Sequence, residues 1–312
     1  MRVLAVDLGG SHATCALVDD RSILSRAALE FPDSRKLAPL LSAIGGALRK
    51  LAAQDRTPVR GVGFGFCGQV DAARCRVSGT NGKYVDAPDL DLSQWAQNDL
   101  GLPLCLENDA RLALLGEAYA GAAQGETDVV MFTLGTGIGG VAMMGGELVR
   151  GKHGQAGVLG GHVTVNVKGR PCTCGALGCA ESEASGWALP LVCASWPGFA
   201  ISALAAQEIN FESLFSCAAS HDRIAGEILD HCLRVWGAAA ITAIHSFDPE
   251  VLIYGGGVLK SADVVIPFLQ DYVSRYAWTP WGKVRVRPAQ LGNDAALLGV
   301  LPLFQQEQRF VR

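Results

Sequence analysis

Residues 3–18 read VLAVDLGGSHATCALV, which is an apolar run, a glycine turn and a second apolar run. Short runs rich in β-branched side chains and bounded by glycine predict two strands joined by a tight turn. Asp7 stands near the end of the first run, so the predicted turn at Gly9-Gly10 has a carboxylate beside it.

The same order returns in the second half of the chain. Asp128–Leu134 predicts a strand, Gly135–Gly140 a glycine loop and Val141–Met144 a returning strand. Val251–Tyr254, followed by Gly255-Gly256-Gly257, predicts one more strand that ends in glycine. Two strand–loop–strand units indicate an internally duplicated α/β fold.

The rest of the chain alternates predicted strands and helices. Apolar runs predict strands over 23–31, 59–66 and 104–106, and periodicity predicts helices over 36–53, 108–119, 222–247, 262–276 and 295–304. Gly61, Gly63 and Gly65 interrupt the strand over 59–66. We expect these glycines to lie where a side chain would keep a ligand away from the backbone.

Composition limits the class of protein. A chain of 312 residues exceeds the ~250–300 residues at which one hydrophobic core stops growing, so we expect two lobes. With 49% hydrophobic and 18% charged residues a disordered chain is excluded, and a net charge of −4 disfavours duplex nucleic acid as a partner. Neither an export signal nor a membrane-spanning run is found, so we expect a cytoplasmic protein with reduced thiols.

The glycine loops are candidate phosphate sites. Residues 135–140 contain Gly-x-Gly-x-x-Gly, but a dinucleotide site needs a helix next, and the following residues predict a hairpin. A glycine turn can instead point several N–H groups at one anion, although a plain tight hairpin is the alternative for each loop alone. Three such loops favour a nucleoside triphosphate with Mg²⁺. The candidate nucleotide-binding residues are Asp7, Gly9, Gly10, Ser11, Gly135, Thr136, Gly137, Gly256 and Gly257.

A cysteine cluster predicts a metal site. Cys172, Cys174 and Cys179 lie within eight residues, and His162 lies ten residues upstream of the first, with His153 as the alternative histidine. A closed Cys3His set is typical of structural zinc, which leaves no coordination position for water and argues against zinc as the catalyst. The seven other cysteines are scattered, as expected of small core residues.

Glu107-Asn108-Asp109 stands where a predicted strand runs into a predicted helix, a place at which α/β folds present reactive groups. Phosphoryl transfer needs the γ-phosphate held, its charge offset by Mg²⁺ and one carboxylate to take the proton of the attacking hydroxyl. Asp109 is the candidate carboxylate. Helix capping is the alternative, above all for Asn108.

Together these residues resemble the ROK sugar kinases (repressor, open reading frame, kinase), members of the actin-like ATPase superfamily. The resemblance covers nearly the whole chain, and its most specific motif is Cys172-x-Cys174-Gly-x-x-Gly-Cys179-x-Glu181. It implies an α/β, two-lobed actin-like ATPase (ribonuclease H-like) fold with a structural zinc loop. Residues 1–116 plus 295–312 would form a small lobe and 117–294 a large one, with nucleotide and sugar in the cleft between them.

The resemblance also implies an activity. The protein would be an ATP:sugar phosphotransferase that acts on a hexose or N-acylhexosamine, usually at the 6-hydroxyl, with Asp109 as general base. His162, Cys172, Cys174 and Cys179 would bind Zn²⁺, and members of the family often form homodimers. Because His162 would touch both metal and sugar, we expect zinc loss to disturb sugar binding before ATP binding. The implied sugar contacts are Gly68, Asn81, Asn108, Asp109, His162 and Glu181.

Two departures from the family leave the sugar open. Family kinases usually carry Glu-x-Gly-His before the cysteines, whereas residues 157–162 read GVLGGH, with one extra residue and no acid. Cys67 also replaces a residue that is often proline. Two alternatives follow: a non-catalytic sugar-binding zinc protein, or a sugar-sensing repressor of the same family. The repressor is disfavoured because its helix-turn-helix segment would precede a first strand that begins here at residue 2.

Overall fold

A computed structural model describes residues 1–31, 34–54, 56–80, 82–157 and 160–310. The chain divides into two compact units. The first comprises Met1–Gly125, Arg150–Ala156 and the chain from Gln290 onward, and the second comprises Glu126–Val149 and Gly157–Ala289. Each unit has a hydrophobic core of its own.

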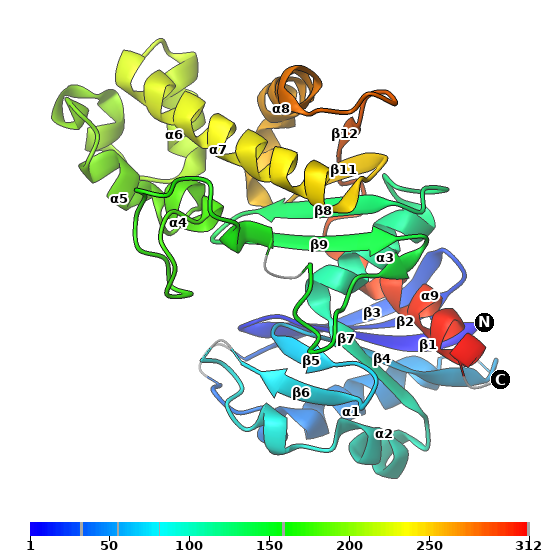
Figure 1. The fold of residues 1–312 in the computed structure, drawn as a ribbon. Helices are drawn as coiled ribbons and strands as arrows, with labels where there is room; N and C mark the ends of the chain where they lie inside the picture. The colour runs from blue at the N-terminus through cyan, green and yellow to red at the C-terminus, as the bar shows by residue number, and fades with distance from the viewer. Residues whose placement is uncertain (32–33, 55, 81, 158–159, 311–312) are drawn as a thin grey trace. The chain divides into compact units, whose positions relative to one another are not determined.

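The first unit is built on a five-stranded sheet with the order β3-β2-β1-β4-β7. Figure 1 shows α1 and α2 on one face of this sheet and α9 on the other. Its elements are β1 (Arg2–Leu8), β2 (His12–Asp19), β3 (Ser22–Glu30), α1 (Ala38–Ala52), β4 (Val59–Phe66), β5 (Gln69–Asp71), β6 (Arg76–Gly79), η1 (Ala87–Asp89), α2 (Leu92–Leu100), β7 (Leu104–Asn108), α3 (Asp109–Ala120), η6 (Gly292–Asp294) and α9 (Ala295–Phe310).

The second unit has a sheet with the corresponding order, β10-β9-β8-β11-β12. Figure 1 shows α7 lying along this sheet, and a cavity of about 220 Å³ is lined by side chains of α7, β8 and β9. Its elements are β8 (Val129–Leu134), β9 (Ile138–Met144), β10 (Glu147–Leu148), η2 (Gly160–His162), α4 (Ala180–Ala184), α5 (Leu189–Ala194), η3 (Phe199–Ile201), η4 (Ala203–Ala206), α6 (Phe211–Ala219), α7 (Arg223–Phe247), β11 (Val251–Gly255), η5 (Gly257–Ser261), α8 (Ala262–Tyr276) and β12 (Arg285–Pro288).

The predicted duplication is confirmed by strand pairing. β1 pairs antiparallel with β2 and parallel with β4, which pairs parallel with β7. In the second unit β8 pairs antiparallel with β9 and parallel with β11, which pairs parallel with β12. One difference is that β9 begins at Ile138, so the loop expected over Gly135–Gly140 is shorter, because Gly139 and Gly140 already pair with Thr133 and Phe132.

Gly61 and Gly63 of β4 serve packing rather than a ligand, which corrects the expectation for these two residues. A Cβ on Gly61 would lie 2.5 Å from the Phe304 ring, and one on Gly63 would lie 2.1 Å from Val300, both in α9. On the opposite face Phe64 meets the Trp95 ring of α2 edge-on, with centroids 6.3 Å apart. Since neighbouring strand residues face opposite sides, the glycine face of β4 lets α9 approach closely.

Helix α3 determines where the first unit ends, at Gly125 and not near residue 116. A Cβ on Gly116 would lie 1.9 Å from the Ala295 carbonyl oxygen, and one on Gly299 would lie 1.9 Å from the Leu112 carbonyl oxygen. The α3 and α9 backbones are therefore nearly in contact. Such an approach is open only to glycine, and it places the whole of α3 in the first unit.

A buried ion network attaches Arg150–Ala156 to the first unit. The Glu107 carboxylate is fully buried, and it accepts hydrogen bonds from Arg111 Nη1 at 3.4 Å and Arg150 Nε at 2.7 Å. Arg111 Nη2 also donates to the carbonyl oxygens of Gly154 at 2.9 Å and Ala156 at 2.8 Å. Buried charges persist only when they are paired and hydrogen-bonded, so this segment and α3 stabilise each other.

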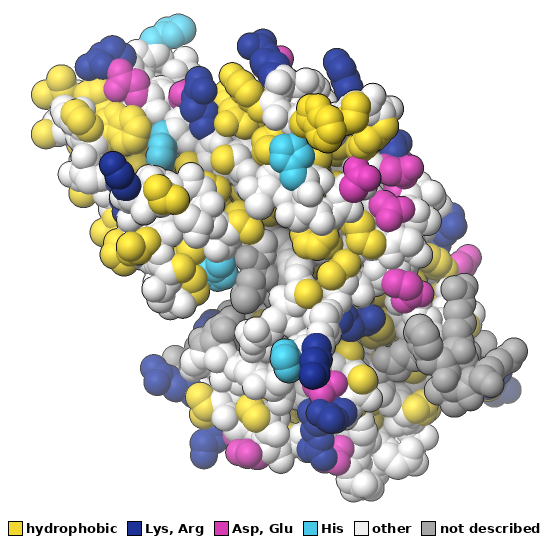
Figure 2. Space-filling model, in the orientation of Figure 1, with side chains coloured by type: hydrophobic (Ala, Val, Ile, Leu, Met, Phe, Trp, Pro, Cys, Tyr) yellow, Lys and Arg dark blue, Asp and Glu magenta, His cyan; other side chains and the backbone are white. Residues whose placement is uncertain are grey.

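Figure 2 shows basic and acidic side chains interspersed on the face that it draws. Hydrophobic side chains gather there over α8, near which Tyr276, Trp278 and Trp281 are exposed. Across the described residues, none of the helices combines the length and the apolar content needed to cross a membrane.

Candidate functional site

The candidate groups of the first unit lie at one edge of its sheet. β1, β4 and β7 run parallel, and the register places Asp7 beside Gly65, which lies beside Glu107. One step further, Leu8 lies beside Phe66, which lies beside Asn108. The glycine turn after β1 and the start of α3 therefore meet at the carboxyl ends of the strands, the edge at which α/β sheets bind ligands.

Asn108 caps α3, as the capping alternative proposed. Its Oδ1 accepts the Arg111 N–H at 3.1 Å, and its Nδ2 donates to the Gly68 carbonyl oxygen at 3.1 Å and to Asp109 Oδ1 at 2.9 Å. Asp109 Oδ1 also accepts the Ala110 N–H at 2.8 Å. Within the described chain no other residue donates to Asp109 Oδ2, so one carboxylate oxygen is fixed and the other is free to take a proton.

Two carboxyl groups at this edge have raised pKa values. Burial, and then the nearby charge of Asp7, raise the pKa of Asp109 to about 6, while hydrogen bonds from Ala110 and Asn108 act in the opposite direction. Burial raises the pKa of Asp7 to about 6. A carboxylate whose pKa lies close to neutral pH is suited to general-base catalysis.

The first glycine turn is held from two sides. Gly9 N–H donates to the His12 carbonyl oxygen at 2.9 Å, and the buried Tyr84 hydroxyl donates to the Gly9 carbonyl oxygen at 2.7 Å. Ser11 follows as an exposed residue. This turn is therefore a fixed feature of the backbone to which a phosphate could bind.

Lys83 is a residue that the sequence analysis missed. A Cβ on Gly10 would lie 2.1 Å from Lys83 Nζ, so this ammonium group lies against the glycine turn. Lys83 is exposed, and its charge lowers the pKa of Cys67 against the larger effect of burial, which raises it to about 11. A cation at this place can offset phosphate charge. The only sequence signal was a lysine two residues after the candidate Asn81, which itself lies outside the described residues.

The glycine loop of the second unit presents two N–H groups. Gly135 N–H donates to the Gly137 carbonyl oxygen at 3.0 Å, and Ile138 N–H donates to a Glu181 carboxylate oxygen at 2.9 Å. Nowhere in the described part of the chain does an acceptor meet the N–H of Thr136 or of Gly137. These two donors, with the exposed Thr136 hydroxyl, form a nest that fits an anion.

The third glycine cluster lies beside this loop. β11 and β8 run parallel, with Gly255 beside Thr133, so both strands end at the same edge. Gly256 has φ +90°, and a Cβ there would lie 2.3 Å from the Leu134 carbonyl oxygen. Gly257 has open space around it. Bare backbone next to a phosphate nest suits the base or ribose of a nucleotide.

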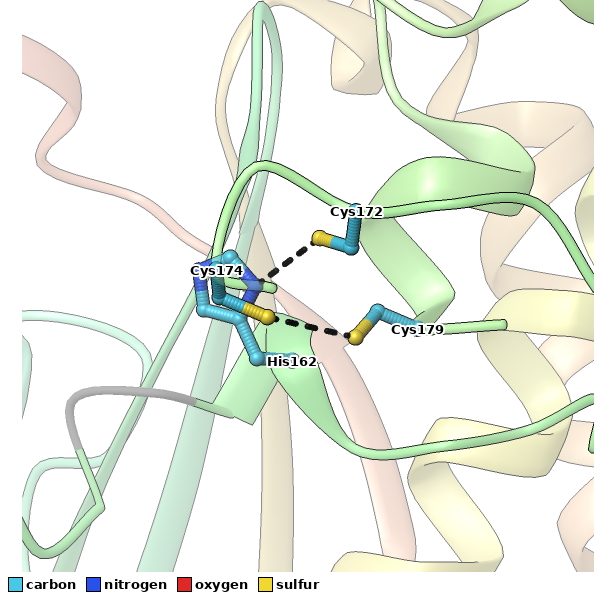
Figure 3. A group of neighbouring side chains, drawn as sticks. All are labelled: His162, Cys172, Cys174 and Cys179. Atoms are coloured by element: carbon cyan, nitrogen blue, oxygen red, sulfur yellow. Dashed lines mark hydrogen bonds between the residues drawn. The ribbon is translucent and has the colours of Figure 1, made fainter. Parts of the chain in front are cut away.

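The four expected metal ligands come together. Their ligand atoms all lie within 4.8 Å of one another, and Figure 3 shows the side chains converging, with His162 Nδ1 3.4 Å from Cys172 Sγ and Cys174 Sγ 3.6 Å from Cys179 Sγ. Ligands at about 2.0–2.3 Å around tetrahedral Zn²⁺ lie roughly 3.4–3.8 Å apart. The donor set therefore fits Zn²⁺, both of these distances lie in that range, and the histidine of the cluster is His162 rather than His153.

The stretch that departs from the family packs on β9. A Cβ on Gly161 would lie 1.8 Å from the Ile138 carbonyl oxygen, and one on Gly160 would lie 2.8 Å from Gly140 Cα. No side chain fits at these two positions, so neither can carry the acid that family kinases have before the histidine. Residues 158 and 159 lie outside the described residues.

Comparison with known proteins gives one consistent result. The model of the ROK family matches residues 3–307. The chain is 29% identical to a glucokinase of Thermotoga maritima over 98% of both chains. It is similar in structure to a ROK hexokinase from Thermus thermophilus, with TM-score 0.83 and 28% identity over 99% of this chain and 100% of that one. A ROK family glucokinase from Streptomyces griseus, solved with glucose and AMPPNP, has TM-score 0.76 and 31% identity over 98% and 100%. The expected actin-like ATPase fold is confirmed by these matches.

Proposed function

The chain belongs to the ROK family and is a sugar kinase, and we propose that it transfers the γ-phosphate of ATP to the 6-hydroxyl of a hexose or N-acylhexosamine. The observation that carries the proposed mechanism is Asp109. One of its oxygens is fixed by Asn108 and Ala110, no other residue of the described chain donates to the second oxygen, and its pKa is raised to about 6.

In the proposed reaction Asp109 Oδ2 takes the proton of the sugar hydroxyl while the hydroxyl oxygen attacks the γ-phosphorus of ATP. The bond from that phosphorus to the β–γ bridging oxygen breaks, and ADP leaves. The N–H groups of Thr136 and Gly137 donate to phosphate oxygens, and Lys83 offsets phosphate charge. Asp7 would hold the water shell of Mg²⁺, which supplies further charge neutralisation when bound.

The proposed sugar contacts include five residues that the structure describes. Gly68, Asn108 and Asp109 belong to the first unit, and His162 and Glu181 belong to the second. Asn81 is also proposed, although it lies outside the described residues.

We propose that Zn²⁺ is structural. All four ligands are side chains of the protein, so a tetrahedral ion would keep no position for substrate or water. Its role would be to fix the chain between η2 and α4. Residues 173–177 of this segment are exposed, so few contacts with the rest of the protein hold them in place.

The missing acid guides the choice of sugar. A kinase without the Glu of Glu-x-Gly-His lacks one hydrogen-bond partner for sugar hydroxyls. A sugar with a deoxy or N-acyl group in place of the hydroxyl that this Glu would bind is therefore a candidate beside glucose. Purified protein with Mg-ATP should therefore be assayed, by coupled ADP formation, against hexoses, hexosamines and N-acyl sugars.

The decisive variant is Asp109→Asn, assayed on the best sugar of that panel. It should lower kcat by at least about 100-fold, because general-base catalysis contributes ~10²–10⁴-fold, while ATP binding changes little. Turnover on no sugar of the panel would refute the proposed activity, and unchanged turnover of the variant would refute Asp109 as the base.

A further inference from the structure

Glu181 uses both carboxylate oxygens within the second unit. Oε2 accepts the backbone N–H of Ile138 at 2.9 Å, and Oε1 accepts the indole N–H of Trp187 at 3.2 Å. Ile138 is the residue at which the glycine loop joins β9. The carboxylate thus connects α4 to the loop that presents the Thr136 and Gly137 N–H groups.

Two backbone hydrogen bonds strengthen the same connection. Gly186 N–H donates to the Gly135 carbonyl oxygen, and Trp187 N–H donates to the Thr136 carbonyl oxygen, both at 2.9 Å. The two segments are in close contact, since a Cβ on Gly186 would lie 2.8 Å from the Gly135 carbonyl oxygen. Three hydrogen bonds with residues 181–187 therefore fix three of the four residues from Gly135 to Ile138.

The far end of this segment is the metal cluster. Cys179 is the N-cap residue of α4, and Ala180 N–H donates to the Val163 carbonyl oxygen at 3.0 Å, next to His162. Cys179 also forms a β-bridge with Thr164. The metal ligands, α4, Glu181 and the glycine loop are thus connected to one another by hydrogen bonds and by a short stretch of chain.

We propose that Glu181 is a positioning residue for the nucleotide, whose carboxylate holds the glycine loop in the conformation that binds phosphate. The proposal rests on the proposed ATP-dependent function, and it deepens that function by giving this residue a task on the ATP side. It also implies that zinc loss would affect nucleotide binding, because the metal cluster connects to the phosphate loop through α4 and Glu181.

Nucleotide binding without sugar separates this role from a contact with sugar. Glu181→Ala should weaken the binding of Mg-ADP by roughly 10- to 100-fold, the equivalent of losing a hydrogen bond to a charged group. Glu181→Gln should weaken it less, because the amide oxygen can still accept the Ile138 N–H while the amide N–H₂ meets the indole. Titration calorimetry without sugar measures both.

Trp187→Phe provides an independent variant, since it removes the indole donor and leaves the carboxylate in place. It should weaken Mg-ADP binding by about three- to tenfold. Glu147→Gln, an exposed glutamate in β10 of the same unit, is the matched control and should leave binding unchanged. Amide hydrogen exchange at Ile138 should be faster in Glu181→Ala than in the wild type, which reports the lost hydrogen bond even where folding is weakened.

The outcomes are distinct. Unchanged Mg-ADP binding in Glu181→Ala and Trp187→Phe, with a raised KM for sugar alone, would overturn the positioning role and leave the kinase assignment intact. Weakened Mg-ADP binding in Glu181→Ala and Trp187→Phe, together with a wild type that phosphorylates no sugar, would support the positioning role while the proposed function fails. A wild type that binds no nucleotide would overturn both.

Discussion

At the scale of single residues, Asp109 combines reactivity with a cost in stability. Its pKa in the folded protein is about 6, against 3.8 for the ordinary carboxyl, so the fold binds the proton more tightly than the unfolded chain does. A raised carboxyl pKa gives stability that is complete below about pH 4 and is lost as the pH rises through about 6. The same property that suits a base therefore destabilises the fold at neutral pH.

The pH dependence of Asp109→Asn tests this cost. Above pH 7 the variant should be more stable than the wild type by about 3 kcal/mol, the equivalent of the raised pKa, and below pH 4 the two should be equal. Urea unfolding from pH 4 to pH 8 measures the difference. In the wild type kcat/KM should fall at least about tenfold for each pH unit below about 6, because Asp109 and Asp7 both become protonated there.

Asp89→Asn, at an exposed position, is the control. It should have the same free energy of unfolding as the wild type at each pH, and the same pH profile of kcat/KM. If Asp109→Asn were no more stable than the wild type at pH 8, the carboxyl would not carry the burial cost that its raised pKa indicates.

Among the residue-scale predictions, the convergence of the four metal ligands is confirmed, and the role of Asp109 stays a prediction. Asp109 stands at the end of a predicted strand, and the cysteines have the spacing of metal ligands. Both features can be recognised within a short stretch of sequence. Lys83 and the Ile138–Glu181 hydrogen bond did not follow, because each joins residues far apart in the chain, and no local pattern encodes which donor a carboxylate will meet. The capping role of Asn108 was foreseen as an alternative.

At the scale of elements, the crossing of α3 and α9 depends on glycine. Gly116 and Gly299 let each helix approach the carbonyl oxygens of the other, and the sequence analysis assigned no role to either glycine. The period of the apolar residues predicted both helices well. It could not show how closely they pack, since the absence of a side chain at one helix position matters only when the partner helix is known.

The substitutions Gly116→Ala and Gly226→Ala test this packing as a matched pair. Both glycines lie inside helices, but a Cβ on Gly116 would lie 1.9 Å from the Ala295 carbonyl oxygen, whereas a Cβ on Gly226 in α7 meets nothing within 4 Å. We expect Gly116→Ala to destabilise the protein by about 1–3 kcal/mol through overpacking. Gly226→Ala should stabilise it by about 0.5–1 kcal/mol through helix propensity.

Chemical unfolding of both variants measures the two free energies. Equal effects of the two substitutions would contradict the close crossing of α3 and α9. A destabilised Gly226→Ala would instead mean that the α7 surface is covered by something outside the described chain.

At the scale of the whole molecule, the chain repeats one sheet topology, and the two copies carry different candidate groups. The first unit carries Asp109, Asp7 and Lys83, and the second carries the metal cluster, Glu181 and the nest at Thr136 and Gly137. The duplication was predicted from the two glycine turns. The assignment of Arg150–Ala156 to the first unit was not, because it depends on the buried Arg111 and its distant carbonyl partners.

Because the units have separate cores, metal removal should act on one of them. Chelation should raise amide hydrogen exchange over residues 160–187 and in the Gly135–Ile138 loop, while β1, β4 and α3 keep their protection, since all four ligands belong to the second unit. Hydrogen exchange with mass spectrometry, before and after chelation and after zinc is restored, measures this. Cys174→Ser should reproduce the effect of chelation, and Cys75→Ser in the first unit should not. Faster exchange throughout both units would show that the metal supports the whole fold, and no change anywhere would show that the cluster holds no structural ion.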